Sequence, residues 1–141
     1  MATSPGDIML TARSLLLPTG RESDWRSAVS RAYYSAYQTL RIEIYIQVPL
    51  ARLQSNGLGS KSLLPHDRLC TSWKNCAATR NIGALLDTLR EARNKADYHI
   101  DRTFSYDAAK DYVDDAEDLI GEISTAGVKN LVAVWMDQLA I

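Results

Sequence analysis

The sequence predicts an all-α protein, a bundle of five to six helices around one hydrophobic core. Apolar residues recur at steps of three and four over most of the chain, which is the spacing of one helix face. Glycine and proline are scarce, at 7 and 4 residues, which favours long helices over short strands joined by turns. A length of 141 residues, with 46% hydrophobic and 23% charged residues, suits one folded domain and is too short for two.

The clearest helix begins after Ser23 or Asp24, since either side chain can cap a helix N-terminus, and it runs to about Gln47. Pro49 is the expected stop, because proline lacks an N–H and disfavours helical geometry in the preceding residue. A strand would need alternation in place of this helical spacing. The apolar stripe consists of Trp25, Ala28, Val29, Ala32, Tyr33, Ala36, Tyr37, Leu40 and Ile44.

Shorter helices are expected on either side of this long one. Residues 8–17 form an amphipathic helix that ends at the Pro-Thr-Gly sequence of residues 18–20. Residues 54–62 form a polar, glycine-bearing loop, and the next helix starts near Pro65, a residue suited to the first helical position. Its inward-facing residues are Leu69, Trp73, Cys76 and Ala77.

Two further helices and an apolar tail complete the predicted bundle. The first of these helices carries an apolar stripe from Ile82 to Ala96, and Arg93 occupies one position of that stripe. The second helix follows a turn at residues 102–105. Gly127 is expected to end that helix in a left-handed conformation. Residues 128–141 are expected to be an apolar C-terminal helix or tail that packs on the domain of residues 1–127 or on a dimer partner. The two apolar stripes are Ile82, Leu85, Leu86, Leu89 and Ala96, then Ala109, Tyr112, Val113, Ala116, Ile120 and Ile123.

The formal charge of -1 hides an uneven distribution. Seven acids and one base, Lys110, lie between residues 105 and 123, so ten acids and fifteen bases remain elsewhere. One face can therefore repel nucleic acid while another attracts it, although a solvated acidic helix face with scattered arginines explains the same charges. The acids are Asp107, Asp111, Asp114, Asp115, Glu117, Asp118 and Glu122.

The chain has no run of about 18 apolar residues, and its N-terminus lacks the basic-then-apolar order of a secretion signal. We therefore expect a cytoplasmic protein without a membrane segment. Cys70 and Cys76 lie six residues apart in a predicted helix, where the geometry turns them away from each other. We expect both to be reduced, partly buried thiols.

Arg93 is the residue that a purely structural interpretation explains least well. A guanidinium remains charged and is costly to bury alone, so an arginine on a leucine stripe needs water or a partner. Pairing with Asp97 one turn later is the simplest solution in an arbitrary helix. His66 is expected to be a surface or capping histidine.

Two motifs lie around Arg93. Arg93-Asn94 is followed, after five residues counted from the arginine, by His99, and Ala96-Asp97-Tyr98 directly precedes this histidine. The first is similar to the Arg-x(4-6)-His motif of HEPN domains, and the second resembles the signature of one large branch of that family. The segment at residues 30–37, Ser-Arg-Ala-Tyr-Tyr-Ser-Ala-Tyr, is similar to the long second helix of that branch. Residues 65–69 with Trp73 loosely resemble its next helix start, so the resemblance spans roughly residues 8 to 126. The His-x-Tyr ending of toxins modified by a partner nucleotidyltransferase is absent.

The resemblance implies an antiparallel helical bundle and a metal-independent endoribonuclease that cleaves single-stranded RNA at a homodimer cleft, without a cofactor. A toxin-antitoxin or phage-defence role, with an antitoxin or nucleotidyltransferase as a further partner, is consistent with it. It implies catalytic roles for Arg93 and His99, and supporting roles for Asn94, Asp97 and Tyr98. Candidate RNA contacts are Lys95, together with Arg31 and Tyr34, which lie off the main stripe.

Two alternatives remain open at this point. The chain can be a catalytically silent HEPN module that docks a nucleotidyltransferase, an RNA or another partner, or a helical interaction protein that uses its apolar tail. Cleavage requires a base for the RNA 2′-hydroxyl proton and a cation for the phosphate, and imidazole and guanidinium suit these tasks. Six residues of helix separate Arg93 from His99 by about 9 Å and roughly 120°. Either the helix ends near Tyr98, or the two side chains act from different subunits.

Overall fold

Six helices make up the regular structure of the described residues in a computed structural model, which describes residues 3–48, 66–125 and 127–138. The predicted all-α fold class is therefore confirmed. No described helix is long and apolar enough to cross a membrane. The helices are α1 (Pro5–Leu15), α2 (Glu22–Gln47), α4 (His66–Asn75), α5 (Arg80–Tyr98), α6 (Tyr106–Ile123) and α7 (Val128–Gln138).

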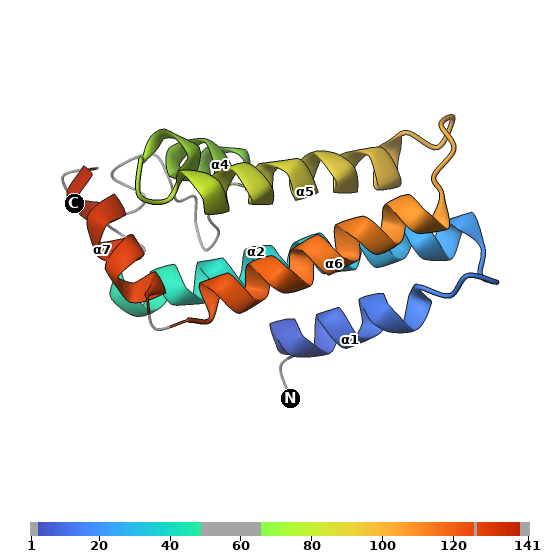
Figure 1. The fold of residues 1–141 in the computed structure, drawn as a ribbon, viewed down its shortest axis with the longest axis horizontal. Coiled ribbons are helices and arrows are strands. Elements are labelled where there is room, and N and C mark those ends of the chain that lie inside the picture. The colour runs from blue at the N-terminus through green and yellow to red at the C-terminus, as the bar shows by residue number, and fades with distance from the viewer. Residues whose placement is uncertain (1–2, 49–65, 126, 139–141) are drawn as a thin grey trace.

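The long helix α2 is the centre of the bundle, and α1, α5, α6 and α7 all pack against it. In Figure 1, α1 and α5 run antiparallel to α2, and α6 runs parallel to it. Helix α4 packs on the first part of α5, at the end of the molecule opposite the connection between α5 and α6. The antiparallel arrangement that the resemblance implied is present for α1 and α5 against α2, whereas α6 is parallel to α2.

The core follows the predicted stripe of α2. The residues of this stripe from Ala28 to Ile44 are buried, and Trp25, at the start of the stripe, is half-buried. Burial of this many large side chains supplies the main driving force for folding, at about 25 cal/mol per Å² of apolar surface. The largest fully buried side chains are Trp73, Trp135, Tyr33, Tyr37, Leu40, Ile44, Leu69, Leu86, Leu89 and Leu119.

The apolar C-terminal segment packs on its own chain through α7. Trp135 is fully buried and its ring lies 5.7 Å from that of Trp73 on α4, measured between centroids. The indole N–H of Trp135 donates a hydrogen bond to the Ser72 hydroxyl at 2.8 Å, so the polar edge of the buried ring is satisfied.

Several predicted helix boundaries differ from those observed. Helix α1 begins at Pro5, three residues early, because Ser4 caps it and accepts a bond from the Asp7 N–H at 3.1 Å. Helix α2 begins at Glu22 with Arg21 as N-cap, so capping by Ser23 or Asp24 was wrong. Asp24 instead accepts a bond from the Arg21 N–H at 3.4 Å.

Two further expectations near helix ends were also wrong. Ala77 is exposed, because α4 ends at Asn75 and the chain turns before α5. Gly127 directly precedes α7 and does not adopt the left-handed conformation, since α6 ends earlier, at Ile123 with Ser124 as C-cap. The expected stop at Pro49, the loop at residues 54–62 and the start at Pro65 lie outside the described residues.

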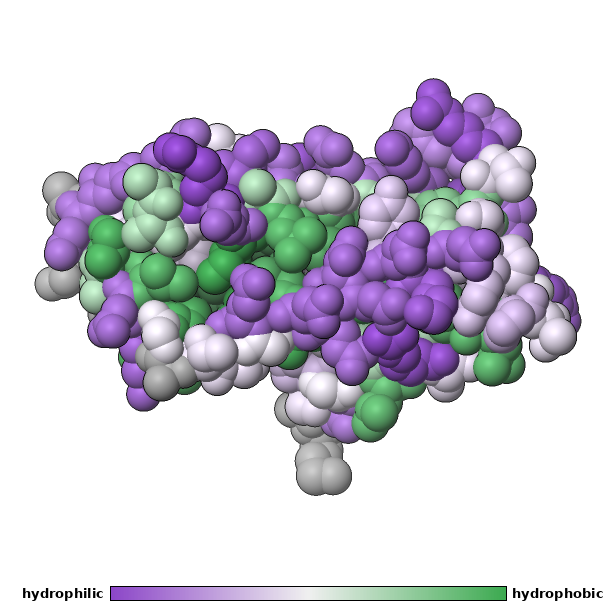
Figure 2. Space-filling view, in the orientation of Figure 1, coloured by the Kyte–Doolittle hydropathy of each residue, from purple (hydrophilic) through white to green (hydrophobic). Residues whose placement is uncertain are grey.

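The acidic residues of α6 lie on its outer face, as the stripe predicted. Asp114 is half-buried and the other six acids are exposed. Arg13 of α1 pairs with Asp114 at 2.8 Å and also with Glu117. Figure 2 shows this hydrophilic band along α6, with hydrophobic residues gathered at the end near α7. Cys70 and Cys76 are free and fully buried, more so than the partial burial expected.

Candidate functional site

The predicted site residues cluster at the C-terminal end of α5, which ends at Tyr98. His99 is the C-cap residue, and its backbone N–H donates a hydrogen bond to the Lys95 carbonyl at 3.1 Å. The helix therefore ends near Tyr98, which was one of the two arrangements expected to overcome the separation of Arg93 and His99 along a helix. Arg93 and Asp97 face α2, whereas Lys95 and His99 face the start of α6.

Arg93 is held by its own helix and by α2. Its guanidinium donates to the Asn94 side-chain oxygen at 2.9 Å and to the Tyr34 hydroxyl, and its Nε lies 3.3 Å from the Asp97 carboxylate. The guanidinium also lies over the Tyr34 ring, 5.0 Å from its centroid. The pairing with Asp97 that a structural role required is therefore present. Ala92 takes the buried position of the stripe, and Arg93 is half-buried.

The remaining candidates on this side of α5 surround a shallow depression of about 250 Å³. Tyr34, Asp97 and the exposed Arg31 line it. The Asp97 carboxylate accepts a hydrogen bond from the Ser30 hydroxyl at 3.1 Å, which joins α5 to α2. We call the group of Arg31, Tyr34, Arg93 and Asp97 the Arg93 side.

His99 lines a second and larger space, between the end of α5 and the start of α6. This space has a volume of about 310 Å³, and four of its lining side chains are basic. We call it the basic hollow, and the residues that define it are Arg26, Lys95, His99, Arg102, Phe104 and Tyr112. Figure 1 shows the α5–α6 connection close to the start of α2.

Arg26 of α2 builds the floor of the basic hollow. It is only 9% exposed and donates hydrogen bonds to the carbonyls of Lys95 and Ala96, both at 3.0 Å, and to that of Arg102. The Lys95 carbonyl also accepts the His99 N–H, whereas the Ala96 carbonyl, in the last turn of α5, receives no backbone N–H from the described residues. A buried cation is well placed to bind carbonyls at the C-terminal end of a helix. Its charge is balanced by Glu22, 3.2 Å away.

Glu22 fixes the other end of the same connection. Its carboxylate accepts a hydrogen bond from the Phe104 backbone N–H, while the Arg26 guanidinium lies 5.4 Å from the Phe104 ring centroid. The start of α2 therefore holds the segment from His99 to Phe104 in place. Sequence reasoning missed Arg26, although it precedes Val29 by three residues and so shares the phase of the α2 stripe.

Three basic residues of the basic hollow have side chains without a partner among the described residues. Lys95, His99 and Arg102 are all exposed, and none of their side chains makes a hydrogen bond or ion pair within that part of the chain. Arg102 was not among the predicted site residues. It could have been noticed as a base close to the predicted motif, three residues after His99.

Tyr98 and Ile100, on either side of His99, are strongly exposed. Their exposed fractions are 70% and 81%, the two highest among the large hydrophobic residues of the described chain. The Arg93 guanidinium lies 5.9 Å from the Tyr98 ring centroid, so Tyr98 connects the Arg93 side to the surface near His99. An apolar surface at this point is suited to contact with another molecule.

His66 is not the surface or capping histidine that was expected. Its ring stacks on Tyr37 with 3.7 Å between centroids, and its Nδ1 lies 2.5 Å from the Tyr33 hydroxyl. Burial, together with the charges of Arg93 and Arg90, lowers the pKa of His66 to about 4. Burial also raises the pKa of Tyr33. The neutral imidazole and the tyrosine hydroxyl therefore share one hydrogen bond, whose donor is set by the histidine tautomer.

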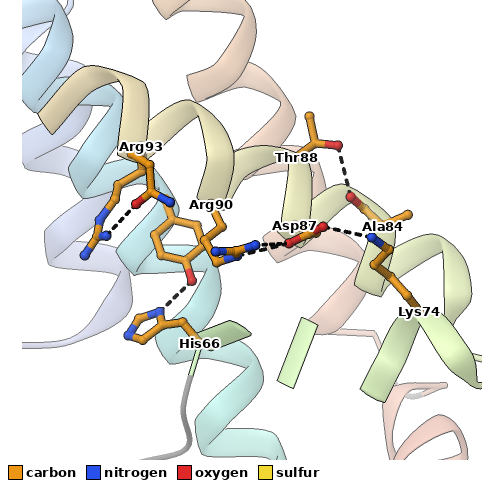
Figure 3. A network of polar contacts seen from close by, with 9 residues as sticks. His66, Lys74, Ala84, Asp87, Thr88, Arg90 and Arg93 are labelled. Atoms are coloured by element: carbon orange, nitrogen blue, oxygen red, sulfur yellow. Dashed lines mark hydrogen bonds and ion pairs between the residues drawn. The ribbon is translucent and has the colours of Figure 1, made fainter. Parts of the chain in front are cut away.

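Figure 3 shows how the polar side chains of α5 continue from Arg93 towards α4. Arg90 donates to Asp87 at 2.8 Å, and Lys74 of α4 binds the same carboxylate at 2.8 Å. His66 lies near Arg93 in this view, at the start of α4. The tyrosine, histidine and arginine side chains beside α2 thus form one packed polar cluster, which half-buries Arg93.

The structure brings the predicted residues together in two groups and not in one. Tyr34, Asn94 and Asp97 contact Arg93, whereas Lys95 lines the basic hollow with His99. Within one chain, Arg93 is not among the residues that line the basic hollow with His99. No group of three or more His, Cys, Asp or Glu side chains among the described residues is arranged to hold a metal ion.

Comparison of the chain with protein-family models, with curated proteins and with solved structures found no match.

Proposed function

We propose that the chain is a metal-independent endoribonuclease of the HEPN type that acts as a homodimer on single-stranded RNA. The observation that supports this best is the position of His99. It is an exposed imidazole beside Lys95 and Arg102 in a hollow of about 310 Å³. A base next to two unpaired cations is a combination suited to cleavage of a phosphodiester.

The proposed reaction uses the 2′-hydroxyl of the RNA as nucleophile. Neutral His99 accepts the hydroxyl proton while the 2′-oxygen forms a bond to phosphorus. The bond from phosphorus to the 5′-oxygen breaks, the leaving oxygen takes up a proton from water, and protonated His99 returns its proton to the solvent. The products are a 2′,3′-cyclic phosphate and a 5′-hydroxyl. A cation bound to the phosphate oxygens stabilises the negative charge that develops in this step.

The dimer accounts for the separation of Arg93 from His99. Since the two side chains lie on different sides of α5, the Arg93 of one subunit is proposed to meet the His99 of the other. Tyr98 and Ile100 offer exposed apolar surface next to His99, where such a contact would have to form. A toxin or phage-defence role would be a consequence of this RNA cleavage.

A second candidate function is supported by the contacts of Arg93. Because its guanidinium already binds Tyr34, Asn94 and Asp97, it is well explained as a structural residue. In that case the chain is a binding module that holds RNA, a nucleotidyltransferase or another partner without cutting it. The two functions are distinguished by whether the purified protein cleaves RNA or only binds it or another partner.

The test is cleavage of a labelled single-stranded RNA by the purified protein with EDTA present. We expect a 2′,3′-cyclic phosphate end, no cleavage of the matching DNA, and a loss of about 10²- to 10⁴-fold with His99→Ala. Arg93→Ala is expected to lose a comparable amount. The control is Lys129→Gln, which removes an exposed cation on α7 and should leave RNA cleavage as it is in the unmodified protein.

Two results would contradict the ribonuclease function. One is an RNA that stays intact with clean protein, alone or freed from a partner. The other is activity that survives in His99→Ala. The binding module would then take its place, provided that the protein still binds RNA or a partner protein. Activity that EDTA abolishes would point to a metal-dependent mechanism or a contaminating nuclease.

A further inference from the structure

The cations of this protein differ in whether the described chain already neutralises them. Arg13, Lys74, Arg90 and Lys110 form ion pairs with carboxylates, and Arg93 pairs with Asp97. Lys95, His99 and Arg102 instead converge on one concave space with no side-chain partner among the described residues. Like charges repel, so grouping two permanent cations and a histidine is unfavourable unless an anion binds between them.

The walls of the basic hollow restrict the kind of anion. Arg26 forms its floor but is engaged by backbone carbonyls and Glu22, so its charge is largely balanced. The Ser105 hydroxyl already accepts the Ala108 N–H at 3.1 Å. Phe104 and the half-buried Tyr112 add aromatic surface beside the cations. Cations next to aromatic rings are suited to a phosphate that carries a ring, as in a nucleotide.

We propose that the basic hollow is a phosphate-binding subsite for single-stranded RNA, in which Lys95 and Arg102 hold the phosphate of a nucleotide beside His99. The volume of about 310 Å³ is at the lower end of that of small-molecule sites and suits one nucleotide. This subsite rests on the proposed ribonuclease function and adds to it. It supplies phosphate contacts to His99 from its own chain, whereas Arg93 would come from the partner.

Arg102 is suited to the role because its position is fixed while its side chain is not. Its backbone carbonyl accepts a bond from Arg26, and its N–H donates to the His99 carbonyl at 3.2 Å. The two residues are therefore joined through the backbone at the C-terminal end of α5. A guanidinium there can donate two parallel bonds to phosphate oxygens.

The experiment measures binding apart from cleavage. A fluorescent single-stranded RNA with 2′-O-methyl groups has no free 2′-hydroxyl to attack, so it stays intact during a fluorescence anisotropy titration. We expect Lys95→Gln and Arg102→Gln each to weaken binding by roughly tenfold, and each to reduce the slope of log Kd against log salt by about 0.7. Lys129→Gln removes the same charge from α7 and is the matched control, with little change expected in either quantity.

A second arm distinguishes a nucleotide subsite from a general anion site. Uridine 3′-monophosphate should displace the RNA at a concentration well below that of inorganic phosphate, because only the nucleotide can use the aromatic wall. Equal displacement by the two would overturn the nucleotide assignment. Both variants should melt at the temperature of the unmodified protein, since their side chains make no hydrogen bond or ion pair among the described residues.

The outcomes separate this subsite from the ribonuclease function. If both variants bind the 2′-O-methyl RNA as Lys129→Gln does, the subsite is refuted, even where the unmodified protein cuts ordinary RNA. If the variants lose binding and the unmodified protein cuts no RNA, the subsite holds and the ribonuclease function fails.

Discussion

Arg26 and Arg93 occupy similar positions in the sequence but different surroundings in the structure. Each is an arginine in phase with an apolar stripe, and each is at least partly buried. Arg26 satisfies the carbonyls at the end of α5, so its role is to hold the connection that carries His99. Arg93 binds side chains only, from Tyr34, Asn94 and Asp97, which can exchange for phosphate oxygens.

His66 gives the protein a pH-dependent stability. Its pKa is about 4 in the folded state and about 6.5 when unfolded, so the unfolded chain binds more protons between these values. The free energy of unfolding should therefore be constant above pH 6.5, as far as this group is concerned, and fall as the pH drops from 6.5 towards 4. Thermal melting followed by circular dichroism at a series of pH values measures this fall.

His66→Gln is the control for this prediction, because glutamine can donate or accept a hydrogen bond with Tyr33 but does not titrate. Acidic residues such as Asp87 lose their ion pairs at low pH in both proteins, so the difference between the two melting curves isolates the histidine. A difference that stays constant from pH 7 to pH 4.5 would show that His66 does not titrate in the way its surroundings require.

At the scale of the helices, Gly83 fixes how closely α5 approaches α4. A Cβ at this position would lie 2.5 Å from the Lys74 backbone nitrogen and 2.6 Å from the Trp73 carbonyl carbon, and backbone atoms cannot move aside cheaply. Gly83→Ala should therefore destabilise the protein by about 1–3 kcal/mol, despite the better helix propensity of alanine. Urea unfolding measures the change in the free energy of unfolding.

Gly121→Ala provides the opposite case within α6. A Cβ there would meet nothing within 4 Å, so the substitution should stabilise the helix by roughly 0.5–1 kcal/mol. If both variants were stabilised, the close packing of α5 against the Trp73–Lys74 backbone would be refuted. Both variants share the general effect of replacing glycine by alanine in a helix. The difference between their free energies of unfolding therefore reports the contact of residue 83 with the Trp73–Lys74 backbone.

The sequence was informative about helix faces and much less so about helix ends. The period of the apolar residues predicted the buried face of α2, because burial of a stripe is a property of many residues together. Caps depend on one or two hydrogen bonds, so Asp24, Ala77 and Gly127 were each misplaced. His66 was misjudged for a similar reason, since its stacking on Tyr37 joins residues that are far apart in the chain.

For the whole molecule, the main consequence is that one α5 helix presents two different polar surfaces. The motif residues could be found from the sequence, but their division between the Arg93 side and the basic hollow depends on where α5 ends and on the packing of α2. Arg26 and Glu22, at the start of α2, fix the connection from His99 to Phe104. A complete active site would then require surfaces from two copies of the chain.

Mixing two inactive variants tests this composite site. In a dimer of one Arg93→Ala subunit and one His99→Ala subunit, one composite site lacks both residues and the other keeps both. Random exchange makes about half of the dimers mixed, and each has one of two sites intact, so the mixture should recover roughly a quarter of the activity of the unmodified protein. RNA cleavage is measured before and after the two proteins are unfolded together and refolded.

Sedimentation of the mixture supplies the control, because recovery requires that dimers form and exchange. Two copies of one variant, treated in the same way, should stay inactive. If mixed dimers form but no activity returns, while the unmodified protein cuts RNA, Arg93 and His99 do not act across the interface. His99 would then work with cations of its own chain, and the unpaired side chains of Lys95 and Arg102 are the ones that its surroundings provide.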